Sequence, residues 1–263
     1  MTTDTMIPAT ANEPIEQNTV VTPLIHTRFS RSLWWLLALL ATYMVAAVLY
    51  AVGAGVYFAS SQPELAHSEG AALLAEHLHT PNGITLMYLA TAIPVLLLLL
   101  KAASLPPQHW QQTLAMRAVA LKRYLPWLGA FVGYSLCTTI IDRFWPIEAG
   151  EFIESIKGVR HLGLFITMVL VAPVVEELVF RGYLFQAWRN SFLGLWGTLL
   201  ATSALFTLIH AGQYPMIILA MLFSFSLLLG LAREKTGSVY VPMAMHAANN
   251  LLAFILINWL GYV

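Results

Sequence analysis

Residues 171–185 read VAPVVEELVFRGYLF. Glu176, Glu177 and Arg181 place three full charges inside a run that is otherwise almost entirely apolar. At the centre of a lipid bilayer a charged side chain costs about 2–3 kcal/mol or more, and it persists where it is paired or takes part in function. The partners of these three side chains therefore decide both the fold and the function of the chain.

The composition indicates a membrane protein. The chain has 263 residues, of which 59% are hydrophobic and only 10% are charged, against about 25% charged residues in an average soluble domain. A helix needs about 20 apolar residues to cross the hydrocarbon core. Such candidate spans occur at 32–58, 84–100, 124–141, 162–185, 193–210, 214–231 and 239–260. We therefore predict an all-α, polytopic transmembrane helix bundle of about seven spans.

Three regions follow from this pattern. Residues 1–28 are polar and without periodicity, and we expect them to form a disordered cytoplasmic tail. Residues 29–159 are predicted to be N-terminal membrane scaffold helices, and residues 160–263, which carry the charged stretch, to form the core of the bundle. The formal net charge is zero, so nothing indicates a nucleic-acid partner. The single cysteine, Cys137, excludes an internal disulfide and a CxxC metal site.

The basic residues predict the orientation, because cytoplasmic loops gather Lys and Arg. Arg28 and Arg31 precede the first span, and residues 101–123 hold four more basic residues, whereas residues 59–83 hold none. We expect a cytoplasmic N-terminus in the inner membrane. Residues 101–123 are expected to lie along the cytoplasmic interface, and residues 65–79 to form an amphipathic surface helix.

Polar residues inside the predicted spans concentrate in the last four. Glu177 and Arg181 are four residues apart, so they share one helix face and can pair. Glu176 is rotated by about 100° from Glu177 and is left for another partner. Pro173 lies just before the pair, and because it lacks a backbone donor it can kink the helix and open room for water or substrate.

The same four-residue spacing recurs in two later spans. Phe206 and His210 have this spacing in the fifth predicted span, and His246 and Asn250 have it in the seventh. A carboxylate can act as a general base, or it can hold zinc together with imidazoles. Imidazole N–H and amide NH₂ groups can stabilise an oxyanion. We therefore predict water-driven hydrolysis, with Glu176 meeting two histidines and an asparagine at mid-depth.

Three motifs carry a family resemblance. EExxxR is present at Glu176 to Arg181, FxxxH at Phe206 to His210, and HxxxN at His246 to Asn250, in this order and on separate spans. Over about residues 160–260 the chain resembles the intramembrane protease family that includes the CAAX prenyl endopeptidases and bacterial bacteriocin-processing or self-immunity proteins (the CPBP or Abi family). The resemblance implies a membrane-embedded or lipid-anchored peptide or protein as substrate.

The resemblance also implies roles for the site residues. Glu176 activates the hydrolytic water together with His210, and the oxyanion is stabilised by His246 and Asn250. Glu177 and Arg181 position the site, and Phe206 supports it. Zn²⁺ and a metal-free, glutamate-activated water remain alternatives. The candidate metal ligands are Glu176, His210 and His246, although the chain contains no HExxH sequence.

Two non-proteolytic functions compete with this prediction. The same polar cluster would serve a non-catalytic membrane immunity or partner-binding protein, which would keep its phenotype in a Glu176→Gln variant. A proton-coupled transporter also uses intramembrane carboxylates and histidines, but the inverted repeat expected of one is not seen. One geometric difficulty stands against the protease. His210 falls near the outer end of its predicted span, so tertiary packing must bring it to Glu176.

Overall fold

The computed structural model describes residues 25–62 and 67–261. Most of the predicted disordered tail lies outside these residues, but its last part is docked on the protein. The Ile25 N–H donates to Gln108 Oε1 (2.7 Å), and Gln108 Nε2 donates to the Ile25 carbonyl (3.2 Å). Thr27 is buried. The tail prediction is therefore wrong for these last residues before the first helix.

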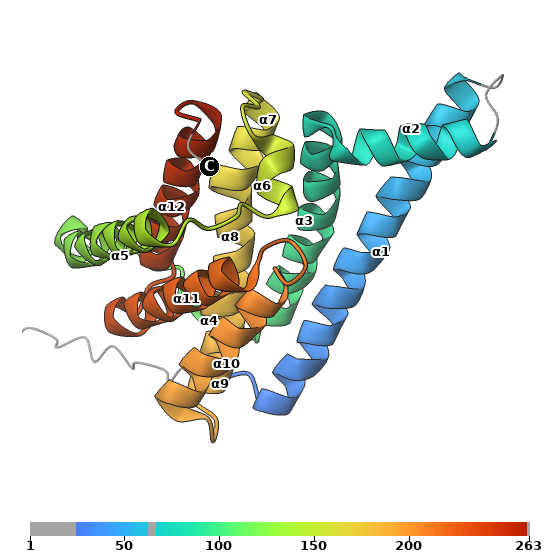
Figure 1. Cartoon of the computed structure of the whole chain (residues 1–263). Coiled ribbons are helices and arrows are strands. Elements are labelled where there is room, and N and C mark those ends of the chain that lie inside the picture. Colours follow the sequence, from blue (N-terminus) through green and yellow to red (C-terminus); the bar gives the residue numbers. More distant parts are fainter. Residues whose placement is uncertain (1–24, 63–66, 262–263) are drawn as a thin grey trace, which may run out of the picture.

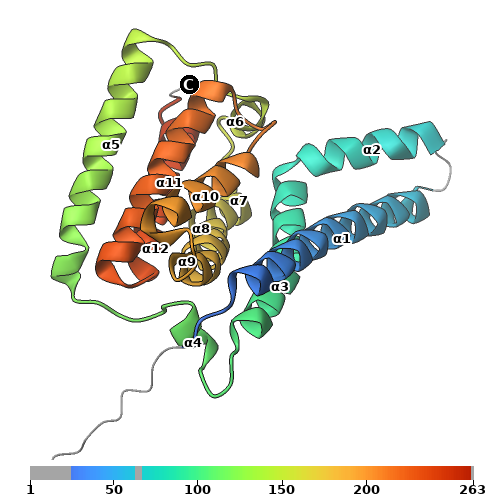
Figure 2. The same ribbon diagram turned by 90° about the horizontal axis from the view of Figure 1, so that it is seen from below.

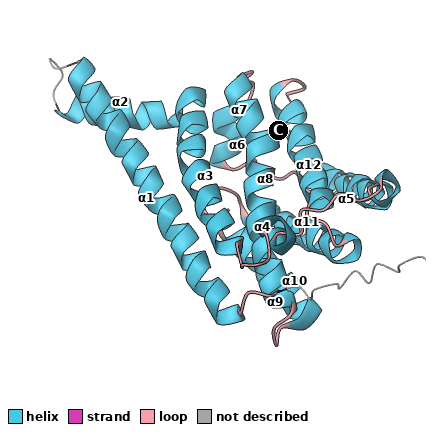
Figure 3. Ribbon diagram, turned by 180° about the vertical axis from the view of Figure 1, so that it is seen from behind, coloured by secondary structure: helices cyan, strands magenta, loops and turns pink. Residues whose placement is uncertain are grey.

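The described residues fold into helices and loops, without a named strand (Figure 3). Six helical segments are long and apolar enough to cross a membrane, and the 15-residue α10 is a shorter apolar helix. This confirms an all-α, polytopic membrane bundle of about seven spans. The spans are α1 (Phe29–Ser61), α3 (Pro81–Ala103), η1 with α5 (Leu121–Arg123 and Leu125–Phe144), the composite segment Leu162–Arg189, α10 (Gly194–Leu208), α11 (Met216–Thr236) and α12 (Tyr240–Asn258).

The composite segment Leu162–Arg189 occupies the centre of the bundle (Figure 1). It packs against α3 on one side and α12 on the other, with contacts to α10 and α11 as well. The first helix, α1, packs on the outer side of α3, while α5 lies at the opposite edge of the molecule against α11 and α12 (Figure 2). The charged stretch of the sequence thus lies in the most enclosed span.

The outward face of α1 is apolar and exposed. Trp34, Leu49 and Val56 are each more than 60% exposed. Such a surface would be costly in water, where large exposed apolar patches are rare, but it needs no cover against lipid tails. The exposed face therefore agrees with a helix that borders the bilayer.

The two loop predictions have different outcomes. The surface helix predicted at 65–79 is present as α2 (His67–His79), which bridges α1 and α3. The stretch 101–123 contains the end of α3 and, apart from it, only the short α4 (Trp110–Thr113) and η1 as helix. Its centre packs against the rest of the protein: Leu114 is fully buried, and the Val239 N–H donates to the Ala115 carbonyl (3.1 Å). Its position along the cytoplasmic interface stays a prediction.

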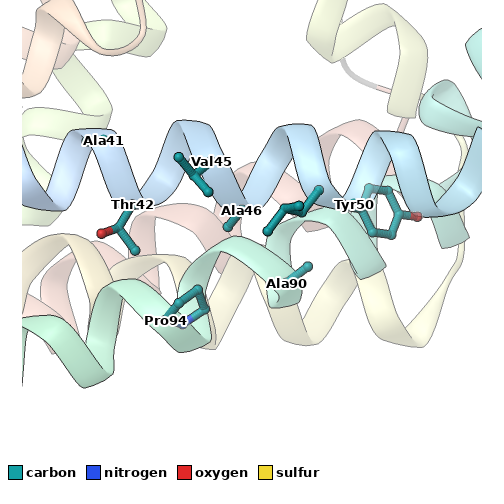
Figure 4. Close-up of a pocket in the computed structure, with 8 residues that line it drawn as sticks. Ala41, Thr42, Val45, Ala46, Tyr50, Ala90 and Pro94 are labelled. Atoms are coloured by element: carbon teal, nitrogen blue, oxygen red, sulfur yellow. The ribbon is translucent and has the colours of Figure 1, made fainter.

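A cavity of about 590 Å³ lies between α1 and α3 (Figure 4). Its wall is almost wholly apolar and is made by Ala41, Thr42, Val45, Ala46, Leu49, Tyr50, Ala90 and Pro94. None of these residues belongs to the polar cluster described below, so this cavity and the candidate site are separate features.

Candidate active site

The span that carries the glutamate pair is not a regular helix. It consists of α7 (Leu162–Ile166), the π-helical segment η2 (Thr167–Val171), α8 (Ala172–Glu177), the π-helical segment η3 (Leu178–Leu184) and α9 (Phe185–Arg189). π-Helical turns are rare, and they occur frequently at functional sites. Both glutamates lie on α8, between the two π-helical segments.

One backbone carbonyl of the first π-helical segment lacks a donor in its own helix, and Asn250 of α12 donates to it. The Ala172 N–H donates to the Thr167 carbonyl, five residues back, instead of to Met168. The next residue, Pro173, has no N–H, so the Met168 carbonyl has no donor in its own helix. Asn250 Nδ2 of α12 donates to this carbonyl at 2.8 Å. One hydrogen of the Asn250 amide is therefore used structurally and the second remains for other chemistry.

The second π-helical segment repeats this arrangement with Arg233. The Phe185 N–H donates to the Phe180 carbonyl, so the Arg181 carbonyl loses its usual donor. Arg233 Nε of α11 donates to it at 3.0 Å, and Arg233 is buried. The predicted sixth span ends at residue 231, two residues before Arg233, but α11 continues to Thr236.

Replacing Arg233 with methionine is expected to destabilise the protein by about 2 kcal/mol. The buried Arg181 carbonyl would lose a charged donor, and such hydrogen bonds contribute about 1.5–3 kcal/mol. Thermal unfolding in detergent should show Tm lower by roughly 5 °C. Lys235→Met is the matched control, because Lys235 lies on the same helix and is exposed. Equal stability of the two variants would contradict the role given to Arg233.

Glu177 and Arg181 form the ion pair predicted from their spacing. Arg181 Nη1 donates to Glu177 Oε1 at 3.0 Å, and both side chains are fully buried. Arg181 Nη2 also donates to the carbonyl (2.9 Å) and the hydroxyl (2.6 Å) of Ser226 on α11. The guanidinium lies 4.9 Å from the ring centre of Phe206. These contacts tie three helices together at the depth of the glutamates.

His246 joins the two glutamates. Its Nδ1 lies 2.9 Å from Glu177 Oε1. A carboxylate only accepts hydrogen bonds, so Nδ1 carries the hydrogen when the carboxylate is ionised. Nε2 then faces Glu176, whose Oε2 lies 3.9 Å away. Glu177 thus fixes the orientation of the imidazole.

Glu176 is the more accessible of the two glutamates, with 17% of its side chain exposed. Its Oε1 accepts a hydrogen bond from the Tyr88 hydroxyl of α3 at 3.2 Å. The sequence predicted that Glu176 meets two histidines and an asparagine. The structure gives His246 and Tyr88 as its near partners, and it places the Asn250 amide on the Met168 carbonyl.

His210 lies in the turn that follows α10, since this helix ends at Leu208. Its Nδ1 lies 2.8 Å from the Phe206 carbonyl, which only accepts, so Nδ1 carries the hydrogen and Nε2 has the lone pair in the neutral ring. The Phe206 ring centre lies 5.0 Å from His210 and 5.8 Å from His246. Both imidazoles therefore lie beside one aromatic ring.

Tyr214 is a further member of this cluster, and the sequence gave no reason to select it. Its ring stacks on His210, with the ring centres 6.2 Å apart. Burial, and secondly the nearby negative charge of Glu176, raise the pKa of Tyr214 to about 12. The Tyr214 hydroxyl is therefore neutral at physiological pH, and the charge of Glu176 contributes to its raised pKa.

The candidate metal ligands do not converge. Within the described part of the chain, no three His, Cys, Asp or Glu side chains come together in a way that could hold a metal ion. The set Glu176, His210 and His246 thus does not fit a Zn²⁺ ion in this arrangement. The side chains of the chain and water are then the groups available for a reaction at this site.

The fold and the site define a class of protein: a multi-pass helical membrane protein with a buried carboxylate–imidazole cluster. Residues 158–252 match the family described as type II CAAX prenyl endopeptidase Rce1-like. This match confirms the resemblance predicted from the three motifs.

A second comparison extends over more of the chain. The chain is 24% identical over 218 residues to an "Uncharacterized 24.3 kDa protein" of Escherichia coli. The aligned segment covers 81% of this chain and 94% of that protein. No solved structure matches the chain. Three spans, α1, α3 and η1 with α5, lie outside the segment matched by the family, and so does Tyr88.

Proposed function

We propose that the chain is an intramembrane endopeptidase that hydrolyses a membrane-embedded or lipid-anchored peptide or protein. The observation that carries this proposal is the contact of Glu176 and His246, at 3.9 Å, inside helices that are apolar enough to span a bilayer. The family match supports the protease class. The distribution of basic residues favours the inner membrane with a cytoplasmic N-terminus.

The hydrolytic water is placed against Glu176. A water at an ordinary hydrogen-bond length from both Glu176 Oε2 and His246 Nε2 would bridge their separation of 3.9 Å. Glu176 takes a proton from this water as general base, and the water oxygen attacks the scissile carbonyl carbon. His210, whose ring also lies beside Phe206, assists through its Nε2 lone pair.

The carbonyl oxygen becomes an oxyanion as the new C–O bond forms. Once the water oxygen is bonded to the carbonyl carbon, the oxyanion accepts hydrogen bonds from the Nε2–H of His246 in its doubly protonated form and from the second amide hydrogen of Asn250. The proton held by Glu176 then passes to the leaving nitrogen as the C–N bond breaks, which yields a carboxylic acid, whose hydroxyl keeps the second hydrogen of the water, and an amine. Glu177 and Arg181 act through His246 as positioning residues.

The test compares protein termini in membrane fractions of cells that carry wild type, Glu176→Gln or Glu154→Gln at equal abundance. Glu154 is a matched control, because it lies outside the cluster with 58% of its side chain exposed. New termini should appear with wild type and Glu154→Gln and be absent with Glu176→Gln. Identical termini in all three strains, with any cellular phenotype retained by Glu176→Gln, would favour the partner-binding alternative.

A further inference from the structure

The two oxygens of Glu176 have partners from opposite halves of the chain. Oε2 faces His246 of α12, which lies inside the segment matched by the family. Oε1 accepts from the hydroxyl of Tyr88, which lies on α3 and outside that segment. Neither the motifs nor the family match assigns a role to any residue of α3.

The helix that carries Tyr88 is part of the site's surroundings. The middle of α3 packs against α7, η2, α8 and η3, which are four of the five pieces of the central span. Tyr88 is partly buried, and a tyrosine hydroxyl withdrawn from water needs a hydrogen-bond partner. Glu176 is the side chain to which it donates. The first half of the chain, expected to be scaffold, thus contributes a polar group to the polar cluster.

A hydrogen bond to one oxygen of a carboxylate restricts the orientation of the whole carboxylate group. The terminal torsion of a glutamate side chain is broad and roughly two-fold, so the carboxylate plane is not fixed by its rotamer. A donor on Oε1 fixes this plane and leaves Oε2 toward His246. The separation of 3.2 Å is long for a hydroxyl and a carboxylate, as is common for catalytic contacts before substrate binds.

We propose that Tyr88 is a positioning residue of the active site, whose hydroxyl sets the orientation of the Glu176 carboxylate toward the water and His246. This inference rests on the proposed function. The catalytic unit therefore extends beyond residues 158–252 and includes α3.

The kinetic test uses Tyr88→Phe, which removes only the hydroxyl, in purified full-length protein reconstituted in liposomes with a fluorogenic prenylated CAAX peptide. Loss of one hydrogen bond to a charged group should lower kcat about tenfold and leave KM within about twofold. Tyr134→Phe is the matched control, because its hydroxyl donates to the Met221 carbonyl (2.8 Å) and not to a glutamate. It should retain wild-type kcat.

Two kinetic outcomes would overturn the inference. Wild-type kcat in Tyr88→Phe would show that the hydroxyl does not orient Glu176. A raised KM with unchanged kcat would make Tyr88 a substrate-binding residue instead.

A second measurement needs no proteolysis. 3-Fluorotyrosine at position 88 should give a ¹⁹F resonance that moves in Glu176→Gln and stays in place in Glu154→Gln. If the resonance has the same position in Glu176→Gln as in wild type, the contact between Tyr88 and Glu176 would be contradicted. If wild type does not cleave the peptide, the proposed function fails for this substrate, and the resonance alone decides whether Tyr88 holds Glu176.

Discussion

Replacing Glu176 with glutamine is expected to lower kcat by roughly 10³-fold or more while the protein stays folded. Glutamine keeps the size of the side chain and can still accept from Tyr88, but it cannot take a proton from water. General acid–base groups contribute about 10²- to 10⁴-fold to a rate. The polar cluster should survive, because the ion pair of Glu177 with Arg181 does not involve Glu176.

The measurement for this variant is kcat in liposomes together with Tm in detergent. Glu154→Gln should match wild type in both quantities. A Glu176→Gln protein with normal Tm and at least one tenth of the wild-type kcat would remove Glu176 from the role of general base.

Breaking the buried pair of Glu177 and Arg181 is expected to give the largest loss of stability. Glu177→Gln leaves the fully buried guanidinium without its counter-charge, and Arg181→Met leaves the carboxylate without its counter-charge. Removal of one partner of a buried ion pair costs about 3–5 kcal/mol. Each single variant should therefore unfold at least about 10 °C below wild type in detergent.

The double variant tests whether the two residues contribute to stability as a pair or independently of each other. Glu177→Gln with Arg181→Met should cost less than the sum of the two single variants, because neither charge is then left alone. Arg189 and Glu234 supply the control pair, with Arg189 Nη2 at 2.9 Å from Glu234 Oε1 and both side chains partly exposed. Its disruption should cost about 1 kcal/mol or less. Additive losses in the buried pair would contradict the coupling.

Much of the fold follows from the sequence, because hydropathy and helix length are local properties. The seven predicted spans occur as helices, with ends that shift by a few residues. One of these shifts matters for the site. The predicted sixth span ended before Arg233, whereas α11 includes Arg233 and this side chain is buried. Local spacing also gave the pair of Glu177 and Arg181 correctly, since residues four apart share a helix face.

The remainder of the site depends on contacts between distant helices, which local patterns do not contain. Pro173 indicated a disturbed helix, but the π-helical segments are completed by Asn250 and Arg233 from α12 and α11. Tyr88 is one of many aromatic residues in an apolar helix, and only packing shows that it reaches Glu176. The burial of Leu114 was missed because the apolar run around it is short, between the polar residues 111–113 and Arg117.

The most direct test of the central claim follows oxygen from water into product. Purified wild type in liposomes is given a membrane-embedded substrate in H₂¹⁸O, and the new C-terminus is examined by mass spectrometry. Glu176-dependent hydrolysis predicts one ¹⁸O in the new carboxylate with wild type and no new C-terminus with Glu176→Gln. A labelled terminus formed equally well by Glu176→Gln, or no cleavage by either protein, would contradict the account.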